Sequence, residues 1–213
     1  MRISFDVDNP DSTQVSQAAA CVRAGGIVVY PTDTLYGLGC NPFHKAALAR
    51  LFELKERDGT QPMLLLIDDK CWAERLGIEV PRTFYDAVKR WWPGPLTIAL
   101  RAAPGLPAGV TSSKGSVAFR LPAAQSTRKF VAECGFPIIS TSVNVSGASP
   151  LASSADIWNE WGPKIDLLLD AGTLPAGQPS TVLDLSIVPP RVIREGQLSA
   201  EVEAWIAAGR VAS

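Results

Sequence analysis

The sequence predicts an α/β layered domain in which helices pack around one twisted, mixed β-sheet. Helical and strand-like patterns alternate along the 213 residues and are joined by short links, which is typical of layered domains. Some neighbouring strand patterns have no helix between them, so we expect both parallel and antiparallel pairs. No repeat, low-complexity tract or linker divides the chain, so residues 1–213 are predicted to form one domain.

The helical patterns have recognisable start signals. The first helix is predicted over residues 12–24, where Asp11 and Gln14 have the spacing of a capping box. A second helix is predicted to begin near Asn41 and Pro42, because asparagine caps helices and proline fits their first turn. Further helices are expected over residues 82–92, 125–134, 154–161 and 199–208.

The strand patterns are short apolar runs rich in β-branched residues. The first, residues 27–30, is continuous enough to be a buried strand. The others are residues 62–67, 96–101, 116–121, 137–141, 165–170, 181–185 and 191–194. Ligands of open α/β sheets bind beyond strand ends, so the polar residues that follow these runs are the candidate site.

Composition excludes several classes of protein. The net charge is −1 with 46% hydrophobic residues, so no global positive field attracts nucleic acid. With one histidine and no CxxC pair, a zinc site is not expected. The four scattered cysteines are expected to be reduced thiols. With neither a signal-peptide pattern nor a membrane-length apolar run, a cytoplasmic location is expected.

The first candidate segment, residues 31–39, reads Pro-Thr-Asp-Thr-Leu-Tyr-Gly-Leu-Gly and directly follows a predicted buried strand. Its hydroxyls, carboxylate and glycines are consistent with a ligand-binding loop or with a simple turn. The chain has neither GxGxxG nor GxxxxGK[ST], so a nucleotide would have to be bound by another device.

The second segment contains Lys55 and Arg57, near the end of a helix that Asp58 and Gly59 are expected to terminate. Two cations favour a helix C-terminus for electrostatic reasons. Alternatively, the Lys55 charge and the Arg57 fork meet phosphate oxygens.

The third segment places Ser140, Ser142 and Asn144 after an apolar run. In an extended chain these alternate residues face one way. The row is either a polar ligand-binding surface or a serine-rich loop that bonds to itself. Without a nearby histidine signal, neither serine is expected to be a triad nucleophile.

The fourth segment is a pair of strand ends near the C-terminus. A hydroxyl cluster that includes Ser180 opens one strand, and Arg194 closes the next. Gly196 permits a tight turn that can aim the Arg194 guanidinium.

Together these segments resemble the signature of the YrdC/YciO family, which includes the threonylcarbamoyl-adenylate synthases. The resemblance covers about residues 12–200, with residues 92–97 and 117–122 between the segments. It implies a three-layer YrdC-like fold with a central ligand cleft. It also implies that L-threonine, bicarbonate and ATP are converted to threonylcarbamoyl-AMP and pyrophosphate, for threonylcarbamoyladenosine modification of tRNA.

The resemblance implies roles for individual residues. The family's KxR motif falls on Lys55 and Arg57, the expected catalytic residues. The expected ATP-binding residues are Lys55, Arg57, Gln61, Ser116, Ser140, Ser142, Asn144 and Arg194. The expected threonine-binding residues are Thr34, Tyr36, Arg120 and Ser180. The implied cation is Mg²⁺ bound through the phosphates, with no metal ligands from the protein.

Two departures from the family pattern bear on function. Leu66 stands where many relatives have a substrate-contacting histidine. Residues 8–10 and 192–196 resemble the YciO branch. KxR and SxN are intact, which favours the synthase over two alternatives. One is a YciO-like protein that binds double-stranded RNA or tRNA without synthase activity. The other acts on a threonylcarbamoyl group already attached to tRNA. The expected downstream partner is the tRNA threonylcarbamoyl transferase complex.

Overall fold

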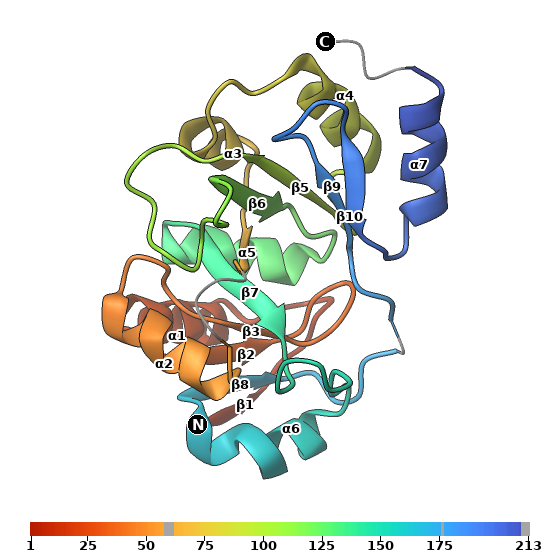
Figure 1. Ribbon diagram of the computed structural model, residues 1–213. Coiled ribbons are helices and arrows are strands. Elements are labelled where there is room, and N and C mark those ends of the chain that lie inside the picture. The colour runs from red at the N-terminus through yellow and green to blue at the C-terminus, as the bar shows by residue number, and fades with distance from the viewer. Residues whose placement is uncertain (58–61, 176, 210–213) are drawn as a thin grey trace.

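The computed structural model describes residues 1–57, 62–175 and 177–209, and one ten-stranded sheet runs through them (Figure 1). Its strand order is β1-β8-β2-β3-β7-β4-β6-β5-β9-β10. The strands are β1 (Arg2–Ser4), β2 (Val28–Tyr30), β3 (Gly37–Gly39), β4 (Leu64–Leu66), β5 (Leu96–Arg101), β6 (Ser116–Arg120), β7 (Ile138–Ser142), β8 (Leu167–Asp170), β9 (Thr181–Asp184) and β10 (Arg191–Arg194). Parallel pairs such as β4–β6 and antiparallel pairs such as β5–β6 confirm that the sheet is mixed.

The described residues also form seven α-helices and one short 3₁₀ helix. They are α1 (Ser12–Arg23), α2 (Lys45–Leu54), α3 (Cys71–Leu76), α4 (Arg82–Trp91), α5 (Gln125–Cys134), α6 (Ser154–Trp161), η1 (Gly162–Lys164) and α7 (Ser199–Ala207). Among the described residues, no helix is long and apolar enough to cross a membrane. All four cysteines are free thiols, as predicted.

Helix α1 begins as its sequence predicts. The Asp11 side chain accepts hydrogen bonds from the backbone N–H of Thr13 (2.6 Å) and Gln14 (3.3 Å), which satisfies two of the N–H groups left free at a helix start. Its buried face consists of Val15, Ala18, Ala19 and Val22.

The predicted start of α2 was wrong by a few residues. The helix begins at Lys45, and the Nδ1 atom of His44 accepts the capping hydrogen bond from the Ala47 N–H at 3.2 Å. The Asn41 side chain instead accepts from the Phe43 N–H at 2.9 Å, so it forms a turn before the helix. The predicted end at Asp58 and Gly59 lies outside the described residues.

Strand β3 was not predicted because two of its three residues are glycines, which have low strand propensity. The glycines are there because neighbouring groups come too close for a side chain. A Cβ on Gly39 would overlap the Ile139 carbonyl oxygen, and one on Gly37 would lie 2.6 Å from the Tyr30 ring. Glycine thus allows β3 to pack between β2 and β7 at the middle of the sheet.

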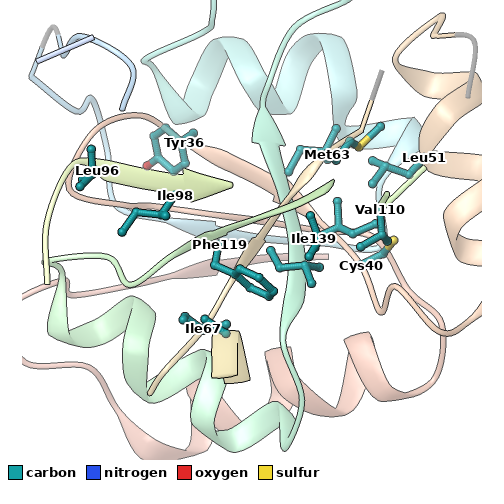
Figure 2. Packing of buried hydrophobic residues seen from close by; sticks show 14 of the residues in the cluster. Tyr36, Cys40, Leu51, Met63, Ile67, Leu96, Ile98, Val110, Phe119 and Ile139 are labelled. Carbon is teal, nitrogen blue, oxygen red and sulfur yellow. The ribbon is translucent and has the colours of Figure 1, made fainter. Parts of the chain in front are cut away.

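The sheet has two unlike faces. Face A carries an apolar row that crosses neighbouring strands in register and includes Leu65, Ile98, Phe119 and Ile139. These residues form one core with side chains from α2, α3, α4, α6 and α7, and Figure 2 shows part of it. Face A is therefore the packed face of the domain.

Face B carries the alternate side chains of the same strands. One part is apolar, with Val28, Leu66 and Ile138 packed against α1 and α5. The remainder carries Val182 and otherwise mainly small or polar residues: Thr97, Ala99, Ser116, Ala118, Arg120, Ser140 and Ser142. The predicted site residues on β6 and β7 thus share face B.

Candidate functional site

Arg120 ties the end of β6 to the loop that follows β2. Its Nη1 donates to Thr34 Oγ1 at 2.8 Å, and its Nε donates to the Gly94 carbonyl at 3.2 Å. Its Nη2 lies 2.7 Å from Asp33 Oδ1. Burial lowers the pKa of Arg120, while the Asp33 charge opposes that effect. Arg120 is 5% exposed, and these contacts fix the orientation of its guanidinium group.

The loop after β2 is a hydroxyl turn. Thr32 Oγ1 donates to the Leu35 carbonyl at 2.6 Å and accepts from the N–H groups of Thr34 and Leu35. This is the local bonding by which threonine stabilises turns. It holds the buried Thr34 hydroxyl against Arg120.

Ser180 and Arg194 form a second oriented group. Arg194 Nη2 donates to the Ser180 carbonyl at 2.9 Å and to its Oγ at 2.8 Å. Ser180 Oγ also lies 2.8 Å from Thr97 Oγ1. Desolvation of the guanidinium lowers the pKa of Arg194, followed by the like charges of Arg120 and Arg57. The charge effects indicate that Arg194 lies near both Arg120 and Arg57.

Lys55 has a different environment from the one predicted for a phosphate ligand. It is 2% exposed, and its Nζ donates to the carbonyls of Ser142 (2.7 Å) and Asn144 (2.5 Å) and to Asn144 Oδ1 (3.1 Å). These three acceptors match the three donors of an ammonium group. Burial, and then the charge of Arg57, lower the pKa of Lys55 to about 8. In this conformation Lys55 positions the loop after β7.

The SxN loop is itself internally bonded. Ser142 Oγ donates to Asn144 Oδ1 at 2.5 Å, and Asn144 Nδ2 donates to the carbonyls of Val145 and Ala148, both at 2.8 Å. The sequence left a self-bonded loop and a ligand surface as alternatives. The loop is self-bonded, and its binding role stays a prediction.

The remaining predicted residues are more scattered. Ser116 lies at the other end of β6 from Arg120, and its Oγ is 2.7 Å from Ser112 Oγ. Ser140 is buried on face B. The Tyr36 hydroxyl donates to the Gly172 carbonyl and accepts from the Ala171 N–H, both at 2.9 Å, which leaves the hydroxyl engaged within the fold. Gln61 lies outside the described residues.

The arrangement favours an anion beside a small polar molecule. The charge of Arg57 lowers the pKa of Lys55, and the charges of Arg120 and Arg57 lower the pKa of Arg194, so these cations are neighbours; Asp33 pairs with Arg120. Clustered guanidinium groups bind phosphate or carboxylate oxygens well. Across the described ranges, no group of three or more His, Cys, Asp or Glu side chains could hold a metal ion.

Two hollows lie away from this cluster. One of about 270 Å³ is lined by residues that include Cys21, Arg50 and Asp166. Another of about 440 Å³ lies between α1 and α5. Neither is lined by a predicted site residue, so the candidate site is defined by its oriented polar groups.

Sequence reasoning assigned no role to Asp33 or Thr97, yet both contact predicted site residues. Asp33 was visible as the single carboxylate in a hydroxyl-rich loop. Thr97 could have been found from strand alternation, because Leu96 and Ile98 on either side of it belong to the apolar core.

Comparison with known proteins gives consistent matches. The family model Sua5/YciO/YrdC, described as "Telomere recombination", matches residues 20–196. A threonylcarbamoyl-AMP synthase of Pyrococcus abyssi is 35% identical over 86% of this chain and 54% of the relative. A putative threonylcarbamoyl-AMP synthase of Mycobacterium tuberculosis is 31% identical over 94% of this chain and 93% of the relative.

Solved structures extend the similarity to three dimensions. P. abyssi Sua5 complexed with L-threonine has a TM-score of 0.90 and 32% identity, covering 97% of this chain and 60% of that one. Escherichia coli YciO has a TM-score of 0.83 and 27% identity, covering 93% and 96%. The chain thus spans just over half the length of the P. abyssi synthase and nearly all of the mycobacterial and E. coli proteins.

Proposed function

The chain belongs to the Sua5/YciO/YrdC family, and from that premise we propose that it is an L-threonylcarbamoyladenylate synthase. It converts L-threonine, bicarbonate and ATP to threonylcarbamoyl-AMP and pyrophosphate. The product supplies the threonylcarbamoyl group for tRNA modification. In reaction class the enzyme is a nucleotidyltransferase.

The observation that carries this proposal is the grouping of cations with oriented hydroxyls. Arg194 lies close enough to Arg57 and Arg120 for their charges to lower its pKa. Arg120 contacts the Thr34 hydroxyl, and Arg194 contacts the Ser180 hydroxyl. The proposed substrates need this chemistry: ATP brings phosphate charge, and threonine brings a carboxylate and a hydroxyl. The relative solved with L-threonine supports the amino-acid assignment.

Within the proposed site, Arg120, Thr34 and Ser180 bind threonine. Tyr36, whose hydroxyl is engaged by residues 171–172, supports that pocket from within the fold. The nucleotide-binding set is Arg57, Gln61, Ser116, Ser140, Ser142, Asn144 and Arg194. Lys55 acts through the loop it holds, so we assign it a positioning role.

The proposed chemistry proceeds through a carbamate. Bicarbonate carboxylates the threonine amine, and a carbamate oxygen then bonds to the α-phosphorus as the bond to pyrophosphate breaks. Such a transfer depends on alignment and charge neutralisation more than on a covalent nucleophile. Arg57 and Arg194 supply protein charge. Mg²⁺ bound through the phosphates would add further positive charge.

We propose residues 1–213 as one domain, a cytoplasmic location, and delivery of product to the tRNA threonylcarbamoyl transferase complex. The P. abyssi synthase has additional length beyond the shared region. The named relatives favour the synthase over the RNA-binding alternative.

The test is to incubate purified protein with ATP, bicarbonate and each amino acid in turn, and to measure pyrophosphate and carbamoyl adenylate. We expect both products with threonine, and neither when bicarbonate or threonine is omitted. Arg57→Ala should reduce both products together. Pyrophosphate release that does not depend on threonine, or no carbamoyl adenylate at all, would contradict the proposal.

A further inference from the structure

The contact between Asp33 and Arg120 is unusual for a sheltered ion pair. Their side chains are 15% and 6% exposed, and Asp33 Oδ1 lies 2.7 Å from Arg120 Nη2. Neither atom, however, has a hydrogen-bond partner of acceptable geometry. The charges are close but the N–H and oxygen are not well aligned, unlike the bidentate pairs that arginine commonly forms with carboxylates.

The rest of the Arg120 guanidinium is already oriented without Asp33. Thr34 accepts from its Nη1 and the Gly94 carbonyl accepts from its Nε. Asp33 is therefore not the sole group that holds the arginine, and its carboxylate retains capacity to accept hydrogen bonds. A carboxylate can accept more hydrogen bonds than a single guanidinium contact provides, so Asp33 can bind a second cationic group while it pairs with Arg120.

A positive and a negative group side by side match one class of molecule. A free α-amino acid carries an ammonium and a carboxylate on the same carbon. We propose that Asp33 receives the ammonium group of the amino-acid substrate while Arg120 receives its carboxylate. This inference rests on the proposed synthase function and adds a role for Asp33.

The assignment has a consequence for the order of events. When the carbamate forms, the ammonium nitrogen loses two protons as its bond to the bicarbonate carbon forms. One proton leaves with the bicarbonate hydroxyl as water, and the other passes to solvent. The group beside Asp33 changes from positive to negative, so attraction becomes repulsion. The negative carbamate is then attracted toward the cations, among them Arg57 and Arg194, where the α-phosphate is proposed to lie.

The competing explanation is that Asp33 serves only to orient Arg120. The two explanations predict different ligand selectivity. Loss of an ammonium partner weakens only ligands that carry an amine. Loss of an Arg120 support weakens every ligand that carries the carboxylate.

The experiment compares L-threonine with 3-hydroxybutanoate, which keeps the carboxylate and hydroxyl but lacks the amine. Affinities are measured by calorimetry or competition in the presence of a non-hydrolysable ATP analogue. The proteins are wild type, Asp33→Asn, the charge-preserving Asp33→Glu, and Glu201→Gln. The last removes a carboxylate from an exposed ion pair with Arg90 and is the matched control. Thermal unfolding verifies that each variant is folded.

We expect Asp33→Asn to weaken threonine binding about tenfold, as for loss of one charge-assisted hydrogen bond, with 3-hydroxybutanoate affinity unchanged. Asp33→Glu should regain part of the threonine affinity, and Glu201→Gln should match wild type. Equal weakening of both ligands, or no weakening of either, would overturn the role of Asp33 while leaving the synthase proposal intact. Failure of wild type to bind threonine would overturn both.

Discussion

Adjacent residues of one strand serve different purposes in this protein. On β6, Phe119 faces the core on face A with no exposed surface, whereas Arg120 faces B and contacts the loop after β2. Face A carries an apolar row that forms one core with side chains from five helices. Face B packs against α1 and α5 over one part and carries mainly small or polar side chains over the rest. Because alternate residues of a strand face opposite ways, the side chains that stabilise the core and those proposed to bind ligands lie on opposite faces of the sheet.

The comparison is tested most strongly by removing a face A side chain. Phe119→Ala should lower the free energy of unfolding by about 3–5 kcal/mol, because a buried aromatic ring is replaced by a cavity. Ser116→Ala, on face B of the same strand, should cost only about 1 kcal/mol, through loss of its bond to Ser112. Urea denaturation measures both. Similar losses would remove the distinction between the faces.

Lys55 is buried like the face A residues, yet it belongs to a predicted binding motif. Lys55→Ala should destabilise the fold by about 1–3 kcal/mol, since carbonyls of Ser142 and Asn144 lose their buried donor. The sequence alone predicts little effect on folding from this charged helix-end residue. Arg57→Ala is the paired variant, and an equal loss of stability in both would contradict the positioning role.

Lys55 also makes stability depend on pH. Its pKa falls from the usual 10.5 to about 8 in the fold, so the unfolded chain binds more protons between these values. The contribution of Lys55 to stability should therefore rise as pH increases from about 8 to 10.5, and be lost as pH falls through 8. Denaturation of wild type and Lys55→Met across this range measures the difference. Parallel curves would contradict the lowered pKa.

Arg57 is expected to affect turnover more than folding. Arg57→Ala should reduce turnover at least tenfold, which corresponds to about 1.4 kcal/mol of transition-state stabilisation. Its free energy of unfolding should change little. Initial rates at saturating ATP and threonine give the effect. Unchanged kinetics would return Arg57 to a purely electrostatic role at the end of α2.

Arg120→Lys tests recognition on face B with the charge retained. Lysine cannot reproduce a planar fork, so the KM for threonine should rise several-fold and more than the KM for ATP. Steady-state kinetics with each substrate varied in turn separates the two. Equal increases would indicate general positioning rather than a carboxylate contact.

Substitution of Leu66 is expected to have the smallest effect of these changes. It is buried in the face B cluster and pairs in register with Arg120, so a histidine here would lie beside the proposed amino-acid site. Leu66→His should strengthen threonine binding by about 0.5–1.5 kcal/mol, the value of one neutral hydrogen bond. Some stability should be lost, because the apolar part of face B would receive a polar ring. Weaker threonine binding in the folded variant would argue for a repurposed pocket.

Much of the fold could be predicted from local patterns. Helices α5 and α6 and strands β5 and β10 have the predicted bounds, because their apolar spacing agrees with the tertiary packing. Strand β3 could not be predicted, since its glycines are required by the close approach of Tyr30 and Ile139, which become neighbours only in the folded sheet. The start of α2 was missed because His44 supplies a cap that propensity ranks below asparagine.

The candidate site was predictable to a similar degree. Strand alternation and family resemblance singled out Arg120, Ser140 and Arg194, whose binding roles stay predictions. The buried bonds of Lys55 and its pairing with the Ser142 and Asn144 carbonyls required the folded loop. Likewise, the Asp33 contact joins residues 87 positions apart, which no local pattern encodes.

The most direct measurement of the central claim is calorimetry of threonine and of a non-hydrolysable ATP analogue on wild type, Phe119→Leu, Arg57→Ala and Arg120→Lys. The account predicts that threonine binds in the presence of a non-hydrolysable ATP analogue. Arg120→Lys should weaken threonine selectively, Arg57→Ala should weaken the analogue selectively, and the face A variant Phe119→Leu should alter neither affinity. Binding that is lost equally in all three variants, or absent from wild type, would contradict the assignment of recognition to face B.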